Sequence, residues 1–189
     1  MNRLIFIRHG ATSSNLSRKY IGRTDEPLCE AGIKQIEELK KESFCVDAVF
    51  VSPLLRARQS AEILFPGMEY TVIDDFRETD FGMFEGKSAD ELSDSPEYSA
   101  WVDSWCKGPV PDGESSEHFK ARCCDAFARV MDFLNKNDTA AFVVHGGVIM
   151  AIMERYAVPR KDFYAYHIAN GEWISCVYEN GIVSIEARF

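Results

Sequence analysis

The chain has 189 residues, enough for one domain that buries a substantial hydrophobic core. With 46% hydrophobic and 27% charged residues it has the composition of a soluble globular protein, and no apolar run is long enough to span a bilayer. A formal net charge of −9 argues against nucleic acid or an anionic membrane surface as a partner, because both require a basic face.

Three segments share one pattern, a short continuous apolar run that breaks at Gly, Ser or Pro. They are residues 4–10 (LIFIRHG), 48–64 (AVFVSPLLRARQSAEIL) and 140–156 (AAFVVHGGVIMAIMERY). Continuous hydrophobicity is typical of strands that are covered on both faces, and the second and third segments continue directly as helices. An amphipathic helix over residues 31–42 follows the first strand, so we expect a parallel pair joined by a right-handed crossover.

The second half of the chain predicts a long helix and a hairpin. The helix begins at Ser115 or Ser116, places apolar side chains on one face from Phe119 to Leu134, and leads into the strand at 140–144. At the C-terminus, two strand-like runs flank Asn180-Gly181, a strong hairpin signal. We therefore expect these last strands to close one edge of an α/β sheet.

Residues 76–114 differ from the rest, because they are rich in Asp, Glu, Ser, Trp and Gly. We predict a helix near residues 95–106 and a turn at 108–114, within an insertion that roofs a site on a single domain spanning 1–189. The aromatic side chains of this segment could stack on a substrate, but their helical spacing favours packing. These aromatic residues are Phe84, Tyr98, Trp101 and Trp105.

The expected compartment is the cytoplasm. The apolar run at residues 4–7 is far too short for the core of a signal peptide. Six cysteines are present, but none form a CxxC pair, so we expect reduced and mostly buried thiols.

Basic and polar side chains follow the three predicted strands. Arg8 and His9 end the first, Ser52 ends the second with Arg56 one turn into the next helix, and His145 ends the third. Ligands of open α/β sheets bind beyond the carboxyl ends of the strands. Two guanidinium groups and two imidazoles in an acidic protein predict a pocket for a small dianion, with phosphate as the natural candidate.

Histidine alone does not establish catalysis, since a lone His9 is more often a hydrogen-bonded structural residue. The adjacent Arg8 changes this balance, because a neighbouring cation keeps the imidazole neutral and leaves a ring nitrogen free to attack phosphorus. Metal ligation is the competing hypothesis. The remaining histidines, His118, His145 and His167, form no pair with metal-binding spacing, so we expect no metal, with His118 and His167 at the surface or the rim of the site.

Phosphoryl transfer from an ester also needs a proton for the departing alkoxide. The acidic loop DDFRETDFGMFEG offers five carboxylates, and their spacing does not choose among them. The candidates are Asp74, Asp75, Glu78, Asp80 and Glu85.

Six motifs in series resemble the histidine phosphatase superfamily, the phosphoglycerate mutase-like proteins, across nearly the whole chain. They are RHGATSSN, YIGRTDEPLCEAGIKQ, VSPLLRARQSAE, RETDFGMFEG, PDGES and VVHGGV. The resemblance implies a three-layer sandwich in which helices flank a mostly parallel sheet, with the small insertion lying over the active site. It also implies no cofactor and no metal.

The resemblance assigns roles residue by residue. His9 would be the phosphorylated nucleophile, with Arg8, Arg56 and His145 binding the transferring phosphoryl group. Glu78 would donate the proton and later act as the base for water. Asn15 would contact phosphate; Thr12 and Gly22 match positions near the phosphate, although Gly22 fits a plain turn equally well.

Within this family, the chain is most similar to the α-ribazole phosphatase branch, which removes a 5′-phosphate during cobalamin assembly. It lacks the longer insertions of the mutases and the Trp that often precedes the equivalent of Asn15, so hydrolysis of a small phosphorylated metabolite is the first hypothesis. The alternatives are a cofactor-dependent phosphoglycerate mutase, a sugar-bisphosphatase, and a non-catalytic phosphoprotein-binding module on the same fold. The sequence does not give the oligomeric state, for which a homodimer is one option.

Overall fold

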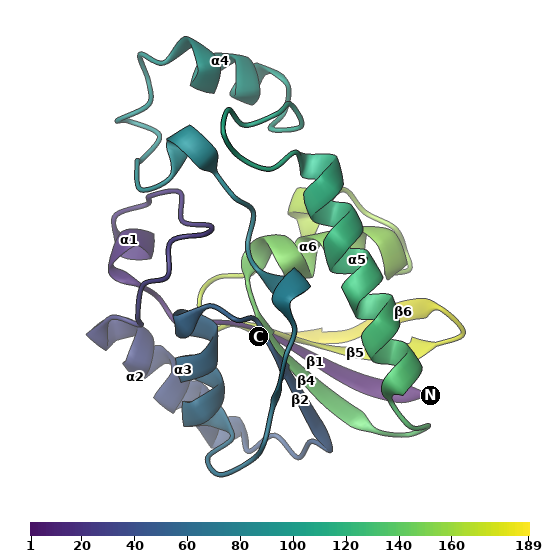
Figure 1. Cartoon of the computed structure of the whole chain (residues 1–189). Coiled ribbons are helices and arrows are strands. Elements are labelled where there is room, and N and C mark those ends of the chain that lie inside the picture. Colours follow the sequence, from purple (N-terminus) through teal and green to yellow (C-terminus); the bar gives the residue numbers. More distant parts are fainter.

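A central six-stranded sheet organises the computed structural model, which describes residues 1–189 (Figure 1). The strand order is β3-β2-β4-β1-β5-β6. The strands are β1 (Asn2–Arg8), β2 (Ala48–Val51), β3 (Thr71–Val72), β4 (Thr139–Val144), β5 (Trp173–Glu179) and β6 (Ile182–Arg188). The helices are α1 (Ser13–Leu16), α2 (Glu30–Leu39), α3 (Leu55–Leu64), α4 (Pro96–Asp103), α5 (Ser116–Phe133) and α6 (Gly146–Tyr156). Four short 3₁₀ turns complete the chain: η1 (Lys40–Glu42), η2 (Asp74–Phe76), η3 (Gly82–Phe84) and η4 (Phe163–Tyr166).

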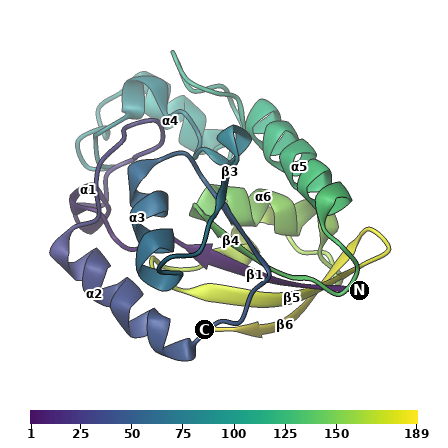
Figure 2. The same cartoon turned by 60° about the horizontal axis from the view of Figure 1, so that its bottom comes forward.

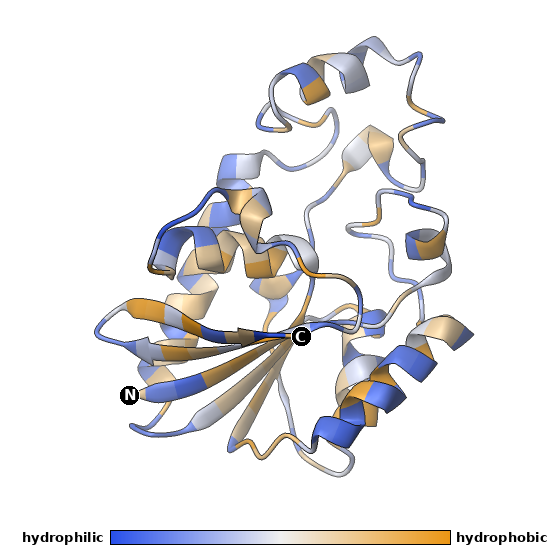
Figure 3. Cartoon of the chain, turned by 180° about the vertical axis from the view of Figure 1, so that it is seen from behind, coloured by the Kyte–Doolittle hydropathy of each residue, from blue (hydrophilic) through white to orange (hydrophobic).

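Helices cover both faces of the sheet, as the continuous apolar strands predict. Ile5 and Ile7 of β1 face α2 and α3 in one core cluster, whereas Leu4 and Phe6 face α5 and α6 in the other. Figure 2 shows the two helical layers on opposite sides of the sheet, and Figure 3 shows hydrophobic stretches within the strands beside helices of mixed hydropathy. The predicted three-layer α/β architecture is confirmed.

The predicted direct pairing of the first two strands is wrong. β1 and β2 run parallel, but β4 lies between them and pairs with both. The helical crossover from β1 to β2 therefore skips one position in the sheet, and β4, which begins at Thr139, fills it much later in the chain. As a result, the carboxyl ends of β2, β4 and β1 lie side by side.

The C-terminal hairpin is confirmed, and it makes the sheet mixed at one edge. Asn180 and Gly181 join β5 to β6 with φ values of 52° and 81°, the left-handed conformation that a tight hairpin turn requires. β5 runs antiparallel to β1, while β1, β2, β3 and β4 are mutually parallel.

The two helices predicted after residue 90 are also present. The hydroxyl of Ser115 accepts the backbone N–H of His118 and caps α5, and the hydroxyl of Ser95 caps α4 through the N–H of Tyr98. None of the helices combines the length and apolar character that crossing a membrane would require.

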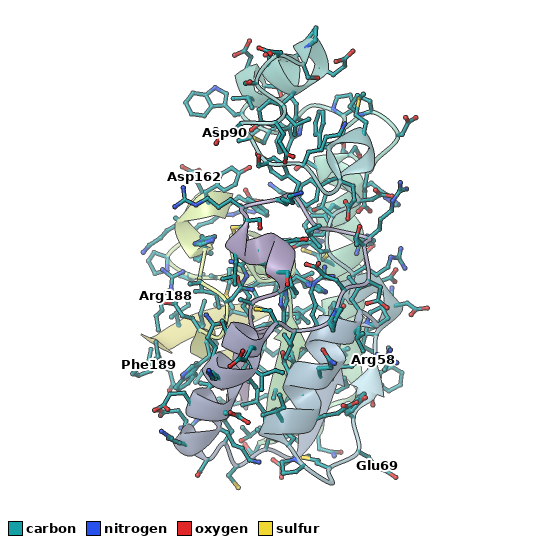
Figure 4. All side chains as sticks on the ribbon, turned by 90° about the vertical axis from the view of Figure 1, so that its left-hand side faces the viewer. Arg58, Glu69, Asp90, Asp162, Arg188 and Phe189 are labelled. Carbon is teal, nitrogen blue, oxygen red and sulfur yellow. The ribbon has the colours of Figure 1, made fainter.

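The segment predicted as an insertion, residues 76–114, contains η3 and α4 and is called the cap segment below. It stands beyond the carboxyl edge of the sheet, and Asp90 of this segment lies at the opposite end of the molecule from Glu69 (Figures 1 and 4). Phe84 and Trp101 pack in a small core of their own, as predicted. The packing prediction is wrong for Trp105, whose side chain is 80% exposed.

Candidate active site

The peptide of His9 continues the ladder between β1 and β4, because its N–H donates to the carbonyl of Val144 at 3.0 Å. The chain then turns at Gly10, where a Cβ atom would lie 2.5 Å from the carbonyl oxygen of Gly32. Only glycine allows this close approach. The turn leaves the imidazole of His9 buried, 3% exposed, at the carboxyl edge of the sheet.

A single hydrogen bond fixes the tautomer of His9. Its Nδ1 atom lies 2.7 Å from the carbonyl oxygen of Gly10, which can only accept, so Nδ1 carries the proton. Nε2 is then the atom with the free lone pair. Burial, reinforced by the charges of Arg56 and Arg8, holds the pKa of His9 well below its ordinary value. The ring is therefore neutral and suited to nucleophilic attack at neutral pH.

His145 follows β4 and lies beside His9, with ring centroids 5.0 Å apart. Its Nε2 atom is 2.6 Å from the hydroxyl of Ser52, whereas its buried Nδ1 atom has no partner. Burial and the nearby Arg56 hold the pKa of His145 well below its ordinary value. If the Ser52 hydroxyl donates to Nε2, Nδ1 presents an N–H donor to the site.

Arg56 extends from α3 and is almost fully buried, with 1% exposure. Its guanidinium donates to the carbonyls of Thr24 at 2.7 Å and Gly22 at 2.9 Å, so the loop after α1 fixes its orientation. Burial lowers the pKa of Arg56 from its ordinary value. This shift reflects the cost of keeping a cation away from water, which the nearby carboxylates, Glu78 first among them, offset only in part.

Arg8 is a second cation of this group. Its guanidinium donates to the carbonyl of Ile168 at 2.7 Å and contacts Nε2 of His167 at 3.2 Å, while its buried Nε has no partner. Neither Arg8 nor Arg56 forms an ion pair with a carboxylate. Two cations, a neutral imidazole and unpartnered buried N–H groups can together bind a dianion such as a phosphoryl group.

The geometry separates Glu78 from the other acidic candidates. Its carboxylate accepts the N–H of Gly147 in the first turn of α6 at 3.0 Å and its own neighbour Thr79 N–H at 2.9 Å. Its charge acts on both Arg8 and Arg56. Gly147 is required here, since a Cβ atom would lie 2.2 Å from Glu78 Oε1.

The other acidic candidates are engaged elsewhere or lie outside this group. Asp75 pairs with Arg129, Asp80 accepts from Arg23 and the N–H of Gly82, and Glu85 accepts the N–H groups of Gly22, Thr24 and Phe81. Glu78 is therefore the candidate carboxylate that the fold brings against the N-terminus of α6, directly after His145.

Asn15 lies at the edge of the same group. Its Oδ1 atom accepts the N–H of Thr12 and the side-chain amide of Asn170, which also donates to the carbonyl of His9. These contacts orient the Asn15 side chain and leave its Nδ2 group without an acceptor in the protein. Asn15 can therefore donate to a ligand.

Thr12 and Gly22 support the site from the backbone. The buried Thr12 hydroxyl accepts the N–H of Asn15 and caps α1. The Gly22 carbonyl holds Arg56, and a Cβ atom on Gly22 would lie 1.6 Å from the carbonyl oxygen of Thr79. The turn glycine thus brings the loop of Arg56 against the loop of Glu78.

A cavity of about 640 Å³ begins at Glu78 and Gly147 and extends beneath the cap segment. Aromatic side chains line part of it, together with charged residues such as Lys107, Lys120 and Glu154. The aromatic residues are Tyr20, Phe81, Trp101, Trp105, Phe119, Phe163 and Tyr164. Because the cavity opens beside Glu78, it can receive the remainder of a phosphate ester.

His167 and His118 lie where the sequence predicts. His167 is exposed and contacts Arg8 at the rim of the group, and His118 is at the surface with a 73% exposed side chain. Sequence reasoning missed Arg122, which donates to the carbonyl of Glu78 at 3.0 Å. A sign of it was present, since a charged residue three positions after Phe119 interrupts the apolar face of α5. No group of three His, Cys, Asp or Glu side chains is arranged to hold a metal ion.

A neutral histidine with a free ring nitrogen beside two guanidiniums, at the carboxyl edge of an α/β sheet, favours transfer of a phosphoryl group, and the comparisons with known proteins identify the class as phosphoric monoester hydrolases. The sequence model of the histidine phosphatase superfamily (branch 1) matches residues 4–188, so the chain belongs to this family.

Individual relatives agree with this assignment. The adenosylcobalamin/alpha-ribazole phosphatase of Salmonella typhimurium is 28% identical over 178 residues, which cover 90% of this chain and 88% of that protein. The crystal structure of a putative alpha-ribazole-5′-P phosphatase from Escherichia coli superposes with a TM-score of 0.89 at 25% identity, covering 98% and 95% of the two chains. The structure of a phosphoserine phosphatase mutant from Entamoeba histolytica, in complex with phosphoserine, matches with a TM-score of 0.85 at 25% identity over 100% and 96%.

Proposed function

We propose that the protein is a metal-independent phosphomonoesterase that acts through a phosphohistidine at Nε2 of His9. One observation carries this proposal. The Gly10 carbonyl holds the proton of His9 on Nδ1, so that Nε2 presents its lone pair beside two guanidiniums that form no ion pair with a carboxylate.

In the first half-reaction, Nε2 of His9 attacks phosphorus as the bond from phosphorus to the ester oxygen breaks. Arg8, Arg56 and the Nδ1–H of His145 bind the equatorial oxygens, with Asn15 as a further donor. Phosphoryl transfer depends mainly on positioning and charge stabilisation, which these fixed groups supply. Glu78, in its protonated form, gives its proton to the departing oxygen.

In the second half-reaction, water attacks the phosphohistidine. The carboxylate of Glu78, left unprotonated by the first step, takes a proton from that water. The P–N bond breaks, its electron pair returns to Nε2, and orthophosphate leaves. Glu78 is protonated again and the cycle closes without a net change in the protein.

The proposed substrate is α-ribazole 5′-phosphate or a similar small phosphate ester whose leaving group carries an aromatic ring. Two observations support it: the names of the relatives described above, and the aromatic cavity that starts at Glu78, on the leaving-group side. A substitution of Trp105 tests whether the cavity binds the leaving group. Trp105 lines the cavity but is 80% exposed, so its removal should affect the core little. The variant Trp105→Ala is expected to raise KM for aromatic esters about tenfold, roughly the effect of losing one aromatic contact, and to leave KM for small alkyl phosphates unchanged.

The decisive test is hydrolysis of p-nitrophenyl phosphate in the presence of EDTA by the wild type and by His9→Ala. The proposal requires turnover in EDTA, loss of turnover in the variant, and an acid-labile, base-stable phosphoryl label on His9 after rapid quenching. A label on another side chain, or turnover that EDTA abolishes, contradicts it. Transfer between phosphoglycerates that depends on a bisphosphate primer would instead indicate a mutase.

A further inference from the structure

We infer that Arg122, together with Glu114, is a positioning residue that sets the reach of Glu78 toward the ester oxygen. This inference rests on the proposed role of Glu78 as the proton donor. It extends that role to a buried ion pair outside the phosphate-binding group.

Arg122 uses all five of its N–H donors on one small region. Nε and one terminal nitrogen donate to the two carboxylate oxygens of Glu114, both at 2.7 Å. The remaining donors reach the carbonyl oxygens of Asp75 and Arg77 at 2.8 Å and of Glu78 at 3.0 Å. The guanidinium therefore binds the backbone on both sides of the Glu78 side chain.

The pair is rigidly placed. The side chains of Arg122 and Glu114 are 8% and 9% exposed, and the guanidinium lies 4.9 Å from the ring centroid of Phe119. Glu114 belongs to the PDGES motif, and its own N–H donates to the carbonyl of Asp80 at 2.9 Å. α5 and the end of the cap segment thus hold the loop of residues 75–80 from two directions.

The loop that carries Glu78 needs contacts of this kind to hold its backbone in place. Residues 77–81 belong to no helix or strand, so no regular ladder fixes the backbone that carries Glu78. A general acid must lie within hydrogen-bond distance of the departing oxygen, and a displacement of about 1 Å can lower turnover about 100-fold. A buried ion pair is weak evidence for stability, but its directional donors are well suited to fixing a geometry.

The leaving group distinguishes positioning of the acid from general support of the fold. A p-nitrophenolate leaves readily as an anion, whereas an alkoxide requires the proton. We expect Arg122→Lys, which keeps the charge but has only three donors and no planar fork, to lower kcat for an alkyl phosphate about 10- to 100-fold. The same variant is expected to change kcat/KM for p-nitrophenyl phosphate less than about threefold, because this constant ends at phosphoryl transfer to His9 and does not include the later hydrolysis in which Glu78 acts as the base. KM for the alkyl phosphate should stay unchanged, since Arg8 and Arg56 remain in place.

Two further variants make the test specific. Glu78→Gln is the reference, and Arg122→Lys added to Glu78→Gln is expected to cause no further loss on the alkyl substrate, because both changes remove the same contribution. Arg129→Gln is the matched control. Arg129 lies on the same helix and pairs with Asp75 at 2.6 Å, but makes no contact with Glu78, so its variant is expected to retain both activities.

Equal losses on both substrates, or additive losses in the double variant, would overturn the inference while the proposed function stands. Alkyl phosphate turnover at the wild-type rate in Glu78→Gln would overturn the role of Glu78 and the inference with it. If Arg122→Lys does not fold, Glu114→Gln gives the same comparison, because it removes the charge that orients the guanidinium and keeps the shape of the side chain.

Discussion

The rings of His9 and His145 lie edge to face with centroids 5.0 Å apart, and both are buried beneath two guanidiniums. Neither ring can gain a proton in the folded state without adding a third positive charge to the group. Burial is the largest cause that lowers both pKa values, followed by the charge of Arg56. The stability of the protein should therefore depend on pH in a definite direction.

Above the ordinary histidine pKa of 6.5, both imidazoles are neutral in the folded and unfolded chains and contribute no pH dependence. As the pH falls below 6.5, the unfolded chain takes up protons that the folded chain does not, so the free energy of unfolding decreases. Each ring contributes a slope of about 1.4 kcal/mol per pH unit down to its folded pKa.

Urea unfolding at a series of pH values between about 5 and 8 measures this slope, the window being set by the ordinary histidine pKa. His9→Asn should reduce it by one proton, and the double replacement with His145→Asn by two. An identical pH dependence in wild type and variants would show that neither ring stays neutral through folding.

Ser52 is expected to control the tautomer of His145. Its hydroxyl lies 2.6 Å from Nε2, and only donation to that atom leaves an N–H on Nδ1 for phosphate. Ser52→Ala should weaken inhibition by orthophosphate about tenfold, the equivalent of one hydrogen bond, and Ser52→Thr, which keeps the hydroxyl, should retain most of it. Calorimetric titration with orthophosphate provides the measurement. Unchanged affinity in the alanine variant would mean that His145 binds phosphate without this partner.

Gly147→Ala is expected to displace Glu78. The added methyl group would lie 2.2 Å from Glu78 Oε1 and 2.9 Å from the ring of Phe119, and the carboxylate is the more mobile neighbour. Alkyl phosphate turnover should fall about 100-fold, with a much smaller effect on kcat/KM for p-nitrophenyl phosphate, which does not include the hydrolysis step in which Glu78 acts as the base. Alanine is also about 1 kcal/mol more favourable than glycine within a helix, so the midpoint of urea unfolding should change little. A fall in both activities together with the midpoint would indicate a packing defect instead.

The fold follows from local patterns to a large extent. Continuous apolar strands predict burial on both faces, Asn180-Gly181 predicts the hairpin, and Ser115 predicts the start of α5; all three are present. The position of β4 between β1 and β2 does not follow from any local pattern. Strand neighbours depend on how helices from distant parts of the chain pack on the finished sheet, and a strand–helix–strand unit is compatible with an intervening strand.

The part of the candidate site that could be predicted from the sequence consists of residues that end or directly follow a recognisable strand. Arg8 with His9, and His145 before Gly146, end adjacent strands and meet because their strands pair. Glu78 could not be chosen among five carboxylates by spacing, because its selection depends on the N–H of Gly147, 69 positions away. The contact of Arg122 with the Glu78 loop could not be predicted for a similar reason, because Arg122 donates to a carbonyl 44 positions earlier in the chain.

The last prediction concerns His167, which contacts the guanidinium of Arg8, a group proposed above to bind phosphate. The two side chains approach to 3.2 Å between Nη1 of Arg8 and Nε2 of His167. A guanidinium has no acceptor, so Nε2 must hold a lone pair and His167 must be neutral in this geometry. Partial burial, followed by the charge of Arg8, lowers the pKa of His167, which also faces Glu172 and Arg188. Protonation would replace an attraction with repulsion between two cations.

We therefore expect KM for a phosphate ester to rise as the pH falls below the ordinary histidine value of 6.5 and His167 becomes protonated. His167→Gln keeps an acceptor that cannot be protonated, so it should remove this part of the pH dependence while retaining activity at neutral pH. His167→Lys places a permanent cation beside Arg8 and should raise KM at every pH. Because the phosphate ester itself titrates near pH 6, the informative quantity is the ratio of KM in wild type and variant on one substrate at each pH. A ratio that does not change with pH in the glutamine variant would show that Arg8 keeps its position without His167, held by the Ile168 carbonyl alone.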